Sequence, residues 1–244
     1  MQINKNILEE FKQNGYIVAK NVFSPDFLSL CKKEILSYKS KNSHICKKCN
    51  FGISIPDFVN KHTQLKNTIS LKDNANLHHY LEFIFGGSHQ YRFCQHNDIG
   101  IDRVVGWHKD KLNGKYEKYQ VQDIWSENGL EGHKIVKVLI YLDDHSNNKG
   151  GLQIVPGSHI IKEINSKEPV QIYCNLGDVI IFDQRITHRG TEKLKSKNRI
   201  LVSFGFGANN IYTEEFEKGT ILRQNEQNQN NNLMKMKINI NKKK

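Results

Sequence analysis

The pattern of hydrophobic and polar positions predicts helices in the first part of the chain. In SPDFLSLCKKEILSYKSK, residues 24–41, apolar side chains recur three and four positions apart, as on one face of a helix. Ser24 can cap this helix, and Pro25 suits its first position. Two shorter helices are expected, over residues 5–13 and over residues 76–87, where a Gly-Gly pair ends the pattern.

The later part of the chain has the pattern of strands. Segments rich in β-branched and aromatic residues alternate with turns that contain Gly, Pro, Asn or Asp. The expected strand segments are YIVAKNVF at 16–23, HQYRFCQHND at 89–98, KIVKVLIYLDD at 134–144, LQIVPGSH at 152–159, VQIYCNLGDVIIFDQRITH at 170–188 and RILVSFGFG at 199–207. Short strands at this spacing predict a mainly β fold with flanking helices, in the form of a sandwich, jelly roll or barrel.

The length and composition limit the organisation of the protein. A chain of 244 residues suits one large domain or two small ones, and no internal repeat is visible. The Gln- and Asn-rich segment 224–244 predicts a disordered or loosely attached tail, so a single folded domain is expected over residues 1–223. The chain contains no run of about 18 apolar residues, so no transmembrane helix is expected. The polar N-terminus and the odd number of cysteines favour a cytoplasmic protein with free thiols.

The net charge of +11 raises the question of a nucleic-acid partner. The excess is almost entirely lysine, since the chain has only six arginines, and the lysines fall in solvated runs. A solvated surface explains this pattern better than a phosphate-binding stripe does. The charge therefore favours a macromolecular partner only weakly, a nucleic-acid partner is not expected, and the basic surface mildly favours an anionic substrate.

Three residues that are distant in the sequence have the chemistry of a metal site. The segment GWHKDK contains His108 and Asp110, and a bare His-x-Asp pair is more often a polar surface turn. His188 follows an apolar strand that would hold it rigidly in a β core. Two histidines and one carboxylate on one face suit non-haem Fe(II) and leave three coordination positions open. Arg199, in the next strand, would need a carboxylate partner if it is buried.

In this order the motifs resemble the phytanoyl-CoA dioxygenase family of Fe(II)/2-oxoglutarate-dependent oxygenases. The resemblance covers about residues 5–210. Its segments are FKQNGYIVAKNVFSPDFLSLCKKEI, GWHKDK, KVLIYLDDHSNNKGGLQIVPGSH, NLGDVIIFDQRITHRG and NRILVSFGFG. The resemblance implies a double-stranded β-helix, or jelly roll, with its core at about 88–207 and flanking N-terminal helices.

The resemblance also implies roles for individual residues. Fe(II) would be held by His108, Asp110 and His188, and Arg199 would bind the distal carboxylate of 2-oxoglutarate. O2 would take the last coordination position. The expected reaction hydroxylates an unactivated C–H bond of a small molecule and releases succinate and CO2. The carboxylate of Asp110 favours hydroxylation, because halogenases of this family carry a small residue there.

Other candidate residues rest on weaker signals. Many family members have a small hydroxylated residue two positions after the distal histidine; here that position is Gly190, and the next residue, Thr191, could take the role. Gln95 could contact 2-oxoglutarate and Asn97 the substrate, although ordinary polar alternation in a strand explains both equally well. The long polar segment from 111 to 131 is interpreted as a lid or substrate loop, with Tyr119 and Trp125 as candidate substrate contacts.

Alternative functions stay open at this point. One is an oxygenase that acts on a protein or a nucleic acid. Demethylases of alkylated bases have a second arginine six residues beyond the first, whereas this chain has Gly205. Another is a catalytically silent jelly-roll binding module. The segment HICKKC offers His44, Cys46 and Cys49, which is half a zinc site without a second pair, so free thiols are the favoured interpretation.

Overall fold

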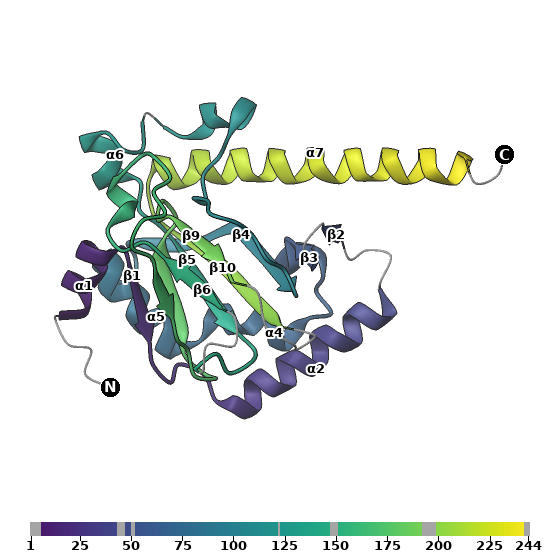
Figure 1. Ribbon diagram of the computed structural model, residues 1–244, viewed down its shortest axis with the longest axis horizontal. Coiled ribbons are helices and arrows are strands. Elements are labelled where there is room, and N and C mark those ends of the chain that lie inside the picture. The colour runs from purple at the N-terminus through teal and green to yellow at the C-terminus, as the bar shows by residue number, and fades with distance from the viewer. Residues whose placement is uncertain are drawn as a thin grey trace.

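Two antiparallel β-sheets and a set of flanking helices make up the molecule (Figure 1). The computed structural model describes residues 6–42, 47–49, 52–121, 123–146, 151–191 and 199–241. In the segment HICKKC, for which free thiols are the favoured interpretation, His44, Cys46 and the side chain of Cys49 lie outside the described residues, so that interpretation stays a prediction. The described cysteines Cys31, Cys94 and Cys174 are buried free thiols.

The larger sheet has the strand order β1-β8-β5-β10-β4-β3-β2, and neighbouring strands are antiparallel. Its strands are β1 (Tyr16–Ala19), β2 (Lys47–Cys49), β3 (Gly52–Pro56), β4 (Tyr91–Ile101), β5 (Ile135–Tyr141), β8 (Val179–Asp183) and β10 (Ile200–Ala208). The smaller sheet has the order β7-β6-β9 and consists of β6 (Leu152–Ile154), β7 (Val170–Ile172) and β9 (His188–Gly190). The strand segments expected from the sequence are therefore present, in a jelly roll.

The helices flank the large sheet and close one end of the molecule. The structure has α1 (Asn6–Asn14), α2 (Pro25–Lys41), α3 (Phe58–Lys61), α4 (Lys66–Ser70), α5 (Ala75–Phe85), α6 (Glu127–Gly132) and α7 (Ile211–Asn241), with short 3-10 helices η1 (Leu71–Asp73), η2 (Gly114–Tyr119) and η3 (Ser158–Ile160). As expected, Ser24 caps α2, and its hydroxyl oxygen accepts a hydrogen bond from the amide of Phe27. Gly86 ends α5 in the left-handed conformation.

The interior strand β5 shows how the sheet separates two layers of core. Val138 and Ile140 pack on the helix side, in the same cluster as Leu28 of α2. Leu139 and Tyr141 pack between the two sheets. Because side chains alternate along a strand, Lys137 lies on the same face as Leu139 and Tyr141, between the sheets. A lysine thus points into the space in which a jelly roll can hold a ligand.

The C-terminal segment differs from the sequence-based expectation. The composition from residue 224 onward favours disorder, whereas the structure continues helix α7 to Asn241. Glutamine, lysine and methionine are good helix formers, and a helix without an apolar stripe has the same polar pattern as a disordered tail. In Figure 1, α7 runs across the top of the view, and its C-terminal end lies beyond the sheets. The domain division at residue 223 stays a prediction. None of the described helices is both long and apolar enough to span a membrane.

Candidate metal centre

Backbone pairing brings the two candidate histidines together. The segment that contains His108 pairs with the start of β9, where the amide of His108 donates to the carbonyl of His188 at 3.0 Å and the reverse hydrogen bond is also 3.0 Å. The ring centroids are 4.2 Å apart. The amide of Asp110 donates to the carbonyl of Gln184 at 2.9 Å, so this residue is also held against the loop before β9.

The side chains of these residues converge. The Nε2 atom of His108 lies 3.4 Å from one carboxylate oxygen of Asp110, and the Nε2 atom of His188 lies 4.0 Å from the other. One potential ligand atom from each residue lies within 4.8 Å of the other two. Small side-chain rotations would let all three hold one ion.

The tautomers of the histidines are fixed by backbone carbonyls. The Nδ1–H of His108 donates to the carbonyl of Gly106 at 2.7 Å, and that of His188 donates to the carbonyl of Ile186 at 3.0 Å. A carbonyl oxygen only accepts, so each Nδ1 carries a proton, and in the neutral ring the lone pair is left on Nε2, where it can bind a metal. Histidines that bind metals are commonly oriented in this way.

Electrostatics act differently on the three residues. Burial lowers the pKa of His188 to about 4, against the attraction of Asp110, so the ring is neutral at pH 7. Burial also lowers the pKa of His108, but the hydrogen bond with Asp110 and the charge of that carboxylate outweigh burial, so the pKa of His108 is raised. Burial raises the pKa of Asp110, but the hydrogen bond with His108 and the charge of Lys137 outweigh it. The pKa of this carboxyl group is therefore well below its usual range. Two imidazole nitrogens and one carboxylate are a donor set that fits a first-row divalent metal such as Fe(II).

A cavity of about 450 Å³ adjoins the three residues and lies between the sheets. Its lining includes side chains from β5, β9, β10 and α7, among them Lys137, His188, Arg199 and Arg223. A volume of this size accommodates small organic molecules.

Arg199 lies at the cavity with its side chain almost fully buried, since the residue is only 4% exposed. Its guanidinium donates to the carbonyls of Thr191 and Arg103, and its backbone amide donates to Asp102 at 2.7 Å. No carboxylate of a described residue forms an ion pair with this guanidinium. A buried arginine in this state suits a ligand that carries a carboxylate.

The sequence of the chain matches the family described as phytanoyl-CoA dioxygenase (PhyH) over residues 11–200. The chain belongs to the phytanoyl-CoA dioxygenase family. This assignment confirms the resemblance expected from the ordered motifs. The chain matches no curated protein by sequence.

Solved structures resemble this member of the phytanoyl-CoA dioxygenase family in fold. EctD from S. alaskensis, solved with bound Fe, is 19% identical, with a TM-score of 0.62 over 84% of this chain and 77% of EctD. HygX from Streptomyces hygroscopicus, solved with nickel and 2-oxoglutarate, is 16% identical, with a TM-score of 0.64 over 85% and 88% of the two chains. The non-heme alpha-ketoglutarate-dependent carbocyclase SnoK, from nogalamycin biosynthesis, is 14% identical, with a TM-score of 0.65 over 84% of each chain. These likenesses confirm the jelly-roll fold.

The other residues singled out in the sequence lie at varying distances from the cavity. Asn97 lines it, but its side chain also accepts from the amide of Val59 at 3.1 Å. The hydroxyl of Thr191 accepts from the amide of Gly151 at 2.7 Å, and Thr191 contacts Arg199 through its carbonyl. The side chain of Gln95 lies outside the described residues.

The two aromatic candidates lie outside the cavity lining. Tyr119 packs against Gly219 of α7. Trp125 lies beneath the ammonium groups of Lys109 and Lys111, at 5.8 and 5.3 Å from its ring centroid. Neither is among the described residues that line the cavity, so their roles in substrate contact stay predictions.

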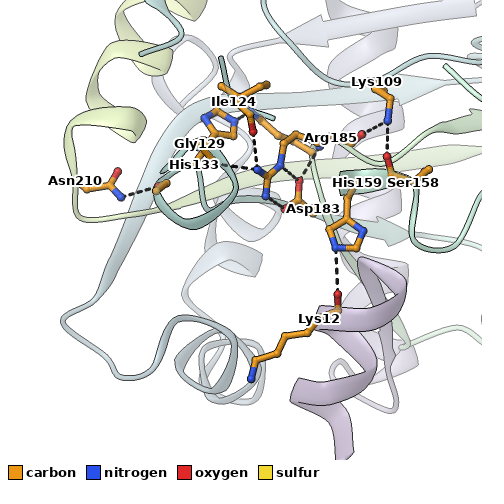
Figure 2. Close-up of polar contacts among 12 residues, drawn as sticks. Lys12, Lys109, Ile124, Gly129, His133, Ser158, His159, Asp183, Arg185 and Asn210 are labelled. Carbon is orange, nitrogen blue, oxygen red and sulfur yellow. Dashed lines mark hydrogen bonds and ion pairs between the residues drawn. The ribbon is translucent and has the colours of Figure 1, made fainter. Parts of the chain in front are cut away.

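A buried ion pair supports the loop between β8 and β9, as Figure 2 shows. Arg185 donates to both carboxylate oxygens of Asp183, at 2.9 and 2.6 Å, and both side chains are buried. The same guanidinium donates to the carbonyls of Ile124 and Gly129, at 3.0 and 3.2 Å. These two carbonyls belong to the segment expected to act as a lid, so the ion pair links that segment to the loop that carries His188.

Lys109, between the first two candidate ligands, joins the same network. Its ammonium group donates to the carbonyls of Ser158 and Arg185, both at 2.6 Å (Figure 2). Burial lowers the pKa of Lys109 to about 8. The ammonium group of Lys109 is bonded to these carbonyls, whereas the side chains of His108 and Asp110 converge with that of His188. The three consecutive polar residues therefore have two different roles.

Sequence reasoning missed several residues that line the cavity, among them Lys137, Arg223 and Gln224. Lys137 interrupts the apolar run IVKVLIYL, and this exception was a signal that could have been used. Arg223 and Gln224 carry no such local signal, because they lie where the pattern becomes low in complexity.

Proposed function

We propose that this protein is an Fe(II)/2-oxoglutarate-dependent dioxygenase that hydroxylates an unactivated C–H bond of a small, anionic molecule. The observation that carries the proposal is the convergence of His108, Asp110 and His188 beside a cavity that also contains a buried arginine, Arg199. Membership of the phytanoyl-CoA dioxygenase family supports it.

The three converging residues would hold Fe(II) through two Nε2 atoms and a carboxylate oxygen. Bound iron, with 2-oxoglutarate and O2, supplies the oxidation of a C–H bond, and 2-oxoglutarate becomes succinate and CO2. The carbonyls of Gly106 and Ile186 keep both imidazoles in the ligating tautomer. The protein thereby fixes the metal on one side and leaves the cavity side for reactants.

Arg199 would bind the distal carboxylate of 2-oxoglutarate. A guanidinium matches a carboxylate with two parallel hydrogen bonds, which fixes the orientation of the co-substrate. Thr191 would support the co-substrate indirectly, because its carbonyl oxygen accepts a hydrogen bond from Arg199 and so helps to position the guanidinium. The hydroxyl of Thr191 is bonded to the backbone of Gly151 instead. Gln95 stays a prediction as a further contact.

Three observations support a small-molecule substrate and hydroxylation. The cavity volume of about 450 Å³ suits a small molecule better than a macromolecular segment. EctD has been solved with 2-oxoglutarate and 5-hydroxyectoine, which is a hydroxylated small molecule. The carboxylate of Asp110 also favours hydroxylation, because halogenases of this family carry a small residue at this position. SnoK, by contrast, is a carbocyclase, so the products must be identified directly.

The test is an anaerobic titration of metal-free protein with Fe(II) and then 2-oxoglutarate. We expect the weak visible charge-transfer band of the chelate, followed by succinate formation when O2 is admitted. The band should be lost in His188→Ala and weakened in Arg199→Ala. A folded wild-type protein without the band would overturn the proposal and favour a silent jelly-roll binding module.

A further inference from the structure

The helix α7 forms one wall of the cavity and is anchored on both sides of its cavity-lining residues. At Gly219 the helix approaches η2 so closely that a Cβ atom would lie 2.5 Å from Leu112 and 2.7 Å from Tyr119. One turn beyond the cavity residues, the carboxylate of Glu226 accepts from the hydroxyl of Tyr116 and pairs with Lys115. The helical turn between these anchors is therefore fixed in position.

Arg223 and Gln224 lie on this fixed turn, and both line the cavity. Phe216 and Thr220, seven and three positions before Arg223, are fully buried. Residues with this spacing share a helix face, so Arg223 extends the buried face of α7 toward the cavity. Its placement follows from the packing of the helix.

The cavity is strongly cationic. Among its described lining residues, six are cationic and two are carboxylates: Arg103, Lys109, Lys111, Lys137, Arg199 and Arg223, against Asp98 and Asp110. Arg103 is paired with Asp98 at 2.6 Å. Lys109 binds backbone carbonyls, and Lys111 lies over an indole ring. Arg199 is assigned to 2-oxoglutarate under the proposed function.

Arg223 is partly buried and forms no hydrogen bond or ion pair with another described residue. Burial lowers its pKa, and the carboxylate that opposes this effect is Asp110. If Asp110 is a metal ligand, the bound cation neutralises its charge, and Asp110 then does not serve as an ion-pair partner of Arg223. The side-chain oxygen of Gln224 is buried and also has no partner among the described residues. An arginine and an amide oxygen without protein partners at a cavity wall are available to bind a ligand.

We propose that Arg223 of α7, together with Lys137 of β5, binds an oxyanion of the substrate, so that the C-terminal helix selects carboxylate- or phosphate-bearing molecules. This inference rests on the proposed function, because it assigns Arg199 and Asp110 to co-substrate and metal. Lys137 is buried at 4% exposure and lies on the cavity face of its strand. Two cations on separate elements, both in the lining of the same cavity, would hold the oxyanion of the substrate within it.

The test uses the full chain with Fe(II) and saturating 2-oxoglutarate under anaerobic conditions. Hexanoate, hexyl phosphate and the neutral hexanamide are titrated separately at constant ionic strength, and the change in the charge-transfer band gives each dissociation constant. The variants are Arg223→Gln and Arg223→Lys. Lys218→Gln is the matched control, because Lys218 lies on the same helix, is exposed and pairs with Glu215.

We expect at least one of the two anions to bind about tenfold or more tightly than hexanamide, as for a hydrogen bond to a charged group. Arg223→Gln should weaken that binding about tenfold, Arg223→Lys should restore part of it, and Lys218→Gln should leave it unchanged. The stronger of the two anions identifies the carboxylate or phosphate class.

Equal binding of hexanamide and the anions would overturn the inference. Unchanged anion binding in Arg223→Gln, or no binding of either anion, would do the same. The intact charge-transfer band in each variant shows that the protein is folded and the metal centre is formed. Absence of the band in the wild type marks failure of the proposed function instead, so the two failures are distinguishable.

Discussion

Two parts of the cavity lining, the metal end around His108, Asp110 and His188 and the α7 wall with Arg223, differ in how their polar groups are satisfied. At the metal end, each candidate histidine has its Nδ1–H bonded to a backbone carbonyl, and Lys109 and Arg185 hold the surrounding loops. At the α7 wall, Arg223 has no hydrogen bond or ion pair among the described residues, although the helix that carries it is firmly packed. One part is completed by the protein and the other is left for a ligand.

The difference teaches which changes should damage the chemistry and which should alter substrate choice. A metal site works only when its ligands are held in position before the ion binds, and hydrogen bonds to outer groups provide this. A substrate site needs unsatisfied groups, since those bonds are made on binding. Changes at the metal end should therefore be costly, whereas changes at α7 should act on substrate binding alone.

The largest effect is expected from His188→Ala. Removing one of three ligands should lower the affinity for Fe(II) about 100-fold or more and abolish succinate formation, because two ligands no longer define a site. Isothermal titration with the metal measures the loss. His89→Ala is the control, because that histidine is exposed and outside the described cavity lining. Equal metal affinity in the two variants would remove His188 from the site.

The next effect concerns the buried ion pair of Figure 2. Arg185→Met should cost about 3–5 kcal/mol of unfolding free energy, because Asp183 is left as an uncompensated buried charge. Denaturant unfolding measures it. The double variant with Asp183→Asn should recover part of the loss. A single-variant loss below about 1 kcal/mol would show that the pair does not support the metal end.

Arg199→Lys should act on the co-substrate. Lysine keeps the charge but loses the planar fork, so we expect the KM for 2-oxoglutarate to rise about 30-fold, from the loss of about 2 kcal/mol for a charged hydrogen bond. The kcat should change less. Arg92→Lys serves as the control, because Arg92 pairs with Glu217 and is outside the described cavity lining. An unchanged KM would contradict the assignment.

His133, within the network of Figure 2, should make stability depend on pH. Its ring accepts from the side chain of Gln184 at 2.6 Å, and burial lowers its pKa from 6.5 to about 3. The unfolded chain therefore takes up a proton first as the pH falls. The contribution of His133 to the unfolding free energy is complete above pH 6.5 and is lost between pH 6.5 and 3. In this range the unfolding free energy falls by up to about 1.4 kcal/mol per pH unit.

The measurement is the unfolding free energy across this pH range for the wild type and for His133→Gln. The variant has no imidazole to titrate, so its stability should fall less steeply. Parallel curves would show that His133 does not contribute.

The smallest effect is expected from Thr191→Val. The hydroxyl is bonded to the backbone of Gly151, so we expect a loss of about 1 kcal/mol in stability with little change in the KM for 2-oxoglutarate. Unfolding and steady-state kinetics measure the two quantities. A several-fold rise in KM without loss of stability would instead favour direct contact of the hydroxyl with the co-substrate, as the sequence suggested.

The sequence by itself determined β1, the strands from β4 onward and the set of residues that meet at the metal end, but not β2 and β3. Apolar alternation and turn residues are local signals, and the order of His108, Asp110, His188 and Arg199 follows the order of the strands. Backbone pairing then places His108 against His188, because the register of two strands fixes which residues face each other.

Only the tertiary structure decided what the rest of the cavity contains. Lys109 binds loops far away in the chain, and Arg223 reaches the cavity because α7 packs against η2 at Gly219. Such placements depend on contacts between residues that are distant in the sequence, and these contacts produce no periodic pattern of apolar residues. Lys137 is the intermediate case, because its position in an apolar strand was visible while the direction of its side chain followed from which face of the sheet the helices cover.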